Sequence, residues 1–148
     1  MQSATLIFES ENDIVMHIAV LVRIAMADGK LLDSEKKFMT NTAILYAKAF
    51  GTKSFEAMVD ECIAGLPKTA VDDWLSIVAT HPSEARNLIK DMVALGYVDG
   101  DFCSNERDVV YAYSDKLNVP RKVVDEIDLH VFNLIQESKA LNQLIAVS

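Results

Sequence analysis

Hydrophobic residues recur at steps of three and four along most of the chain, the spacing that places side chains on one buried face of a helix. The first such face is formed by Ile14, Ile18, Leu21, Ile24 and Ala25. Similar faces follow over most of the remaining chain up to about residue 136. The pattern predicts an all-α fold, a compact bundle of about seven helices.

Residues of the types that begin or end helices separate these faces. Asn12 or Asp13 is the expected N-cap of the first helix. Asp33 and Ser104 are the expected N-caps of two later helices, and Asn118 is expected to end one in the left-handed conformation.

A short motif occurs twice in the chain. In each copy Asp-Gly is followed by an apolar residue two positions after the Gly, and by Glu seven positions after the Asp. The paired residues are Asp28 with Asp99 and Glu35 with Glu106. The offset between the copies is constant, since 99 − 28 equals 106 − 35.

A repeated motif at constant offset indicates an internally repeated architecture. We therefore predict a single domain over residues 1–148 with an approximate internal two-fold axis. Repeat one covers about 14–64, a link covers about 65–82, and repeat two covers about 83–137.

Charge and cysteine content narrow the function. A net charge of −8 argues against nucleic acid as a partner, since phosphate binding needs clustered Lys and Arg. Cys62 and Cys103 lack metal-binding or redox spacing and favour a cytoplasmic protein with free thiols. The longest apolar stretch, 14–27, is too short to span a bilayer and contains His17 and Arg23.

The repeated motif matches only the second half of a calcium-binding EF-hand loop. The positions that should carry the first carboxylates hold Ile24 and Met26 in one copy, and Leu95 and Tyr97 in the other. These apolar residues exclude an EF-hand.

The four repeated acids differ in how well helix electrostatics explains them. Glu35 and Glu106 stand in the first turn of a predicted helix, where the dipole stabilises a carboxylate. Asp28 and Asp99 stand at the end of a predicted helix, where a carboxylate is disfavoured. Such a conflict is typical of a functional position, although an Asp can also hydrogen-bond within its own turn.

Two hypotheses follow for the loops. In the first, Asp28 with Glu35 and Asp99 with Glu106 bind a divalent cation. Oxygen ligands favour calcium, magnesium or manganese, and no organic cofactor is expected. Asp33, Asp101 and Asp108 are candidate additional ligands. In the second, the loops are purely structural and the chain is a helical protein–protein interaction scaffold with a groove between its halves.

At these residues the sequence resembles the TerB-like family of tellurite-resistance proteins, whose helical domains carry Asp-Gly loops followed by an acid. It is also similar to the related helical domain at the front of a membrane-anchored DnaJ-type co-chaperone. The resemblance covers roughly 14–50 and 88–126, and the middle of the chain departs from it.

The resemblance implies a compact helical domain with an acidic, metal-binding site that takes part in stress-response assemblies. Its partners would be other proteins, including membrane-associated ones. The sequence contains no zinc-protease motif, phosphate-binding glycine loop or nucleophile elbow, so we do not expect an enzyme.

Overall fold

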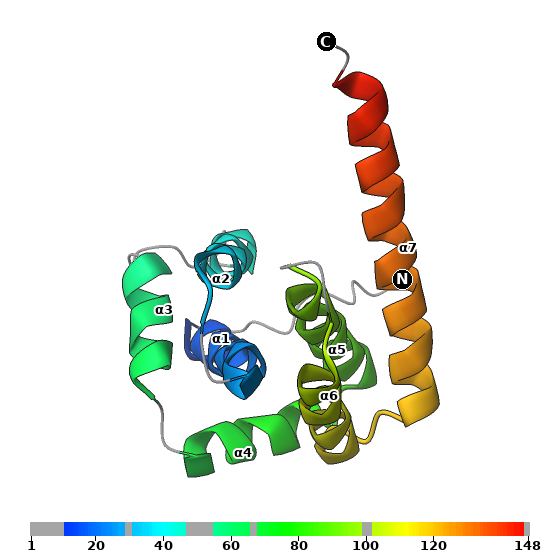
Figure 1. Ribbon diagram of the computed structural model, residues 1–148. Helices are drawn as coiled ribbons and strands as arrows, with labels where there is room; N and C mark the ends of the chain where they lie inside the picture. Colours follow the sequence, from blue (N-terminus) through cyan, green and yellow to red (C-terminus); the bar gives the residue numbers. More distant parts are fainter. Residues whose placement is uncertain (1–10, 29–30, 47–54, 66–67, 99–101, 147–148) are drawn as a thin grey trace.

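The computed structural model describes residues 11–28, 31–46, 55–65, 68–98 and 102–146 (Figure 1). All regular secondary structure in these ranges is helical, which confirms the predicted all-α bundle. The elements are α1 (Glu11–Ala25), the 3-10 helix η1 (Met26–Asp28), α2 (Asp33–Tyr46), α3 (Phe55–Ala64), α4 (Lys68–Val78), α5 (Pro82–Gly96), α6 (Ser104–Lys116) and α7 (Arg121–Ile145).

The helix α1 lies at the centre of the bundle. It contacts α2, α3, α4, α5 and α6, and Figure 1 shows it between α3 on one side and α5 and α6 on the other. Ile14, Ile18, Leu21 and Ile24 have no solvent-exposed surface. Ala19, on the other side of the helix, is only 4% exposed, so α1 is covered on more than the one face that its spacing predicts.

The predicted N-caps all lie inside the helices that they were expected to precede. Asn12 and Asp13 lie inside α1, which begins at Glu11. Asp33 and Ser104 are the first helical residues of α2 and α6, not the caps. In α2 and α6 the preceding residue, Leu32 or Cys103, takes the cap position instead, because a glutamate in the first turn accepts its backbone N–H.

The predicted link between the repeats contains the helix α4. Val71, Trp74, Leu75 and Val78 are buried in the common core, as their helical spacing suggests. The indole Nε1 of Trp74 donates a hydrogen bond of 2.9 Å to the Asp13 carboxylate on α1. This segment is therefore part of the core as well as a connection.

The helix bounds follow the offset of the sequence repeat. Both ends of α5 are displaced from those of α1 by the offset between the two motifs (82 − 11 = 96 − 25 = 99 − 28), and the start of α6 is displaced equally from that of α2 (104 − 33). The third helices differ, since α3 has 10 residues and α7 has 25. Asn118 has φ 57°, which confirms the left-handed residue predicted after α6. The two-fold axis itself stays a prediction.

The last helix, α7, is longer than the face on which it packs. At 1.5 Å per residue its 25 residues extend for about 37 Å. Val124, Asp128 and Val131 are buried, and α7 contacts α5 and α6. From Phe132 to Ile145 every residue except the half-buried Ile135 is exposed, and this half of α7 projects beyond the other helices (Figure 1).

Candidate functional site

The two repeated glutamates make equivalent hydrogen bonds. Glu35 accepts the backbone N–H of Leu32 at 2.9 Å, and Glu106 accepts that of Cys103 at 3.1 Å. Each carboxylate reaches back three residues to the N-cap of its own helix, as in a capping box. Both glutamates are only 2% exposed. Their burial and their bonds explain them as structural residues of the loop-to-helix junction.

The proposed metal ligands are only partly within the described residues. The backbone of Asp28 ends η1, while its side chain, Asp99 and Asp101 lie outside the described part of the structure. Asp33 is exposed on the first turn of α2, and Asp108 is exposed on the second turn of α6. Among the described residues, no group of three or more His, Cys, Asp or Glu side chains is arranged to hold a metal ion. Glu35 and Glu106 each commit one oxygen to the backbone.

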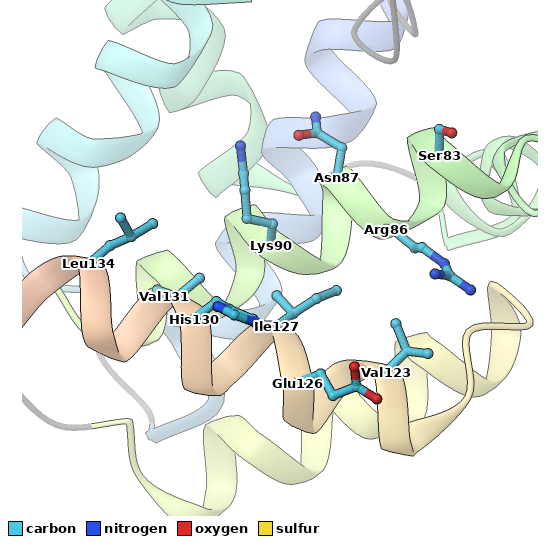
Figure 2. A pocket seen from close by; sticks show the side chains of 10 residues that line it. All are labelled: Ser83, Arg86, Asn87, Lys90, Val123, Glu126, Ile127, His130, Val131 and Leu134. Atoms are coloured by element: carbon cyan, nitrogen blue, oxygen red, sulfur yellow. The ribbon is translucent and has the colours of Figure 1, made fainter.

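A groove of about 500 Å³ runs between α5 and α7 (Figure 2). It lies between two helices of the second repeat, not between the repeats. Its apolar floor comes from α7 and consists of Val123, Ile127, Val131 and Leu134.

The rim of the groove is mainly cationic. Arg86 and Lys90 project from α5, and His130 and Glu126 from α7 (Figure 2). Arg86 and Lys90 outnumber the single carboxylate among the groove residues, although Lys90 also pairs with the Asp91 carboxylate next to it in sequence. On a chain whose net charge is −8, the groove is therefore less acidic than the chain as a whole.

The apolar floor of the groove continues along the projecting half of α7. Leu134, Leu141 and Ile145 are 70%, 56% and 69% exposed. They follow Ile127 at steps of seven, seven and four residues, so they lie within a narrow arc of the same helix face. None of the described helices covers this apolar stripe beyond the groove.

A buried polar pair joins the helices α1 and α5. His17 Nε2 on α1 lies 2.9 Å from the Asp91 carboxylate on α5, and both side chains are buried. Lys90 Nζ approaches the same carboxylate at 3.4 Å. His17 is therefore a core residue, as its place on an apolar helix predicts, and it positions α1 against α5.

A second polar cluster fixes α7 against the loop before α6. Asp128 accepts hydrogen bonds from the Tyr97 hydroxyl and the Arg107 guanidinium, and Arg107 also lies 4.4 Å from the centre of the Phe102 ring. Burial and the bond to Asp128 raise the pKa of Tyr97. Burial opposes the charge on Arg107, but Asp128 outweighs it and raises the pKa of the guanidinium. These groups are held in a closed network.

Comparisons with protein-family models, with curated proteins and with solved structures found no match to this chain. The TerB-like resemblance therefore remains a prediction that depends on the repeated loops. Within the described ranges, no helix combines the length and the apolar character needed to cross a membrane.

The groove and its rim could not be identified from the sequence. Arg86 and Lys90 lie far from His130 along the chain and share no motif with it. These residues become neighbours only when α7 packs on α5. The available signal is the spacing of Leu134, Leu141 and Ile145, the last two of which lie beyond residue 136, where the predicted helical faces end.

Proposed function

We propose that this chain is a non-enzymatic helical interaction module that binds a helix of another protein molecule in the α5–α7 groove. The observation that carries the proposal is the continuity of the groove floor with the exposed apolar stripe on the projecting half of α7. An amphipathic helix laid into an apolar groove is a common mode of recognition.

Physical chemistry supports this role for α7. An isolated helix of about 14 residues is marginal in water, and most helical stability in proteins comes from packing of an apolar face. In the segment from Phe132 to Ile145, Phe132 contacts Tyr97 and Ile135 packs against the core, whereas every residue from 136 to 145 is exposed, including the apolar Leu141 and Ile145 of this segment. Burial of its leucines against a partner would be favourable at about 25 cal/mol per Å² of apolar surface.

Site-specific photocrosslinking tests this proposal. A photoreactive amino acid replaces Leu141 on the apolar stripe, or the exposed Gln143 on a different face of the same helix as a matched control. We expect crosslinks from position 141 to one defined protein species in cells that produce the chain, and few from position 143. Equal crosslinking at both positions, or none at position 141, would contradict the proposal.

Metal binding by a TerB-like module is the second candidate, with a stress-response role in a reducing, cytoplasmic setting and with membrane-associated protein partners. What favours it is that both Asp-Gly loops lead into the same glutamate-capped helix start. Because Glu35 and Glu106 each commit one oxygen to a capping bond, the carboxylates of Asp28 and Asp99 would supply further metal ligands.

Thermal melting with added calcium, magnesium or manganese tests this second candidate. Specific binding should raise the free energy of unfolding by RT ln(1 + [L]/Kd), and Asp28→Asn combined with Asp99→Asn should abolish the increase. Asp73→Asn, at an exposed aspartate of α4 that is not a candidate ligand, is the control. A melting temperature that does not respond to millimolar concentrations of any of the three ions would exclude this role.

A further inference from the structure

We infer that the helix bound in the α5–α7 groove is α7 of a second copy of this chain, in an antiparallel pair. Each copy would place the projecting half of its α7 in the groove of the other. This inference rests on the proposed interaction function and names its partner. Three features support it: the spacing of the apolar stripe, the charge of α7 and the groove itself.

The apolar stripe has the same spacing in both directions along the helix. Apart from the buried Val131, its members are Val123, Ile127, Leu134, Leu141 and Ile145, separated by four, seven, seven and four residues. An antiparallel pair related by a two-fold axis brings together residues equally distant from the axis. With the axis at Leu134, Ile127 would meet Leu141 of the second copy. The two ends of the stripe would meet in the same way.

The two halves of the stripe differ in burial, as expected if each copy places its exposed half in the groove of the other. Val123 and Ile127 are half-buried and line the groove, whereas Leu141 and Ile145 are exposed beyond it. In the pair each groove would receive an exposed half, so both apolar surfaces would be covered by one contact. The contact would extend from position 123 to position 145, or about 33 Å of helix.

Charge favours this contact between two acidic molecules. Two chains that each carry −8 repel one another over most of their surfaces. The segment 129–145 contains only Glu137 and Lys139 as acidic and basic residues, so it is close to neutral. Glu137 is also opposite in sign to the rim residues Arg86 and Lys90 of the groove that would receive it.

Analytical ultracentrifugation of the full chain tests the inference. We expect a species of twice the 16.4 kDa chain mass at micromolar concentrations. Leu134→Glu would place two like charges together at the axis and should weaken the dimer roughly 100-fold or more. Leu134→Lys should do the same alone, whereas an equimolar mixture of the two variants should recover dimer. Gln143→Glu, on a different face of α7, should leave the dimer unchanged.

Circular dichroism keeps these variants interpretable, since Leu134 is largely exposed and its substitutions should leave the helical content unchanged. A wild-type chain that is monomeric at all accessible concentrations overturns the inference, as does a dimer that Leu134→Glu does not weaken. If position 141 crosslinks to a different protein, or to residues 1–10 of its own chain, while the chain stays monomeric, the second copy is excluded. Crosslinking to a different protein would still support the interaction function, whereas crosslinking to residues 1–10 of the same chain would not. Monomeric chain with no crosslink removes both.

Discussion

Glu35 and Glu106 are almost fully buried carboxylates that the fold uses at the starts of α2 and α6. Each accepts a backbone N–H that would otherwise have no partner in its helix. Their place in the first turn predicts that both stabilise their helices through the helix dipole, whereas the structure shows a specific capping bond. The specific bond could not be predicted because it depends on which residue takes the N-cap position.

The capping role predicts how substitutions at these glutamates behave. Glu106→Ala should lower the free energy of unfolding by about 1–2 kcal/mol, since the capping acceptor is lost. Glu106→Gln should cost clearly less, because the amide oxygen can still accept the Cys103 N–H. Urea denaturation of the two variants, and of the same pair at Glu35, measures the difference. Equal losses for Gln and Ala would show that the negative charge matters more than the cap.

Cys62 is a buried thiol whose Sγ donates to the Val15 carbonyl at 3.3 Å. Burial, with a smaller effect of Glu61, raises its pKa from 9.0 to about 12. At pH 8 only about one Cys62 thiol in 10⁴ is ionised, and the thiolate is the reactive form. We therefore expect a disulfide reagent to modify the half-buried Cys103 first, and Cys62 only as fast as the protein unfolds.

The Cys103→Ser variant isolates Cys62 in this experiment. A fast reaction of the native variant at pH 8 would contradict the burial of Cys62. The raised pKa of Cys62 also makes the stability of the protein depend on pH. Between about pH 9 and pH 12 the unfolded thiol loses its proton before the folded one, so the contribution of Cys62 to stability falls as the pH rises.

At the scale of elements, α5 and the loop before α6 fit closely at Gly96. A Cβ added there would lie 2.3 Å from Cδ1 of Phe102. The equivalent positions in the first repeat are Ala25 and Leu31 (96 − 25 = 102 − 31), so that repeat combines a larger helix residue with a smaller loop residue. The two repeats thus distribute volume differently at the same place in the motif.

This difference predicts coupling between two substitutions. Gly96→Ala should destabilise the protein by about 1–2 kcal/mol, because the cost of overpacking exceeds the gain in helix propensity. In the Phe102→Leu background, which reproduces the combination of the first repeat, Gly96→Ala should be neutral or stabilising. A double-mutant cycle measured by denaturation gives the coupling. Additive effects would show that the Phe102 ring can move away freely.

The helices themselves were largely predictable, but their ends and partners were not. The helical spacing of Val71, Trp74, Leu75 and Val78, between the helix-breaking Pro67 and Pro82, agrees with the helix α4. The apolar spacing predicts the last helix up to about residue 136 and leaves open whether the residues beyond extend it. The helix reaches Ile145 because the segment contains no Gly or Pro and is rich in good helix formers. The groove depends on how α7 packs, which no local pattern specifies.

At the scale of the whole molecule, stability should decrease from the centre outward. The helix α1 is covered by η1 and by the helices from α2 to α6, and its polar His17 is paired with Asp91. The projecting half of α7 has exposed backbone hydrogen bonds and no buried residue after Val131. These are the features that separate regions of high and low local stability.

Hydrogen–deuterium exchange should reveal this gradient. In dilute solution, peptides from α1 should exchange slowest, and peptides from 132–145 fastest among the described helices. If two copies pair through α7, protection of 132–145 should increase with protein concentration while that of α1 stays constant. Slow, concentration-independent exchange in 132–145 would contradict both the exposure of this segment and its pairing.

The central position of α1 has a consequence for biosynthesis. Because α1 precedes all the other helices described, the ribosome makes it well before α5 and α6, which cover one side of it. At about 5–20 residues per second, the apolar side chains of the nascent helix wait on the order of ten seconds for these partners. Translation that stops before α5 would leave Ile18 and Leu21 without part of their cover, so prematurely terminated chains should be targets for chaperones and proteases rather than folded half-domains.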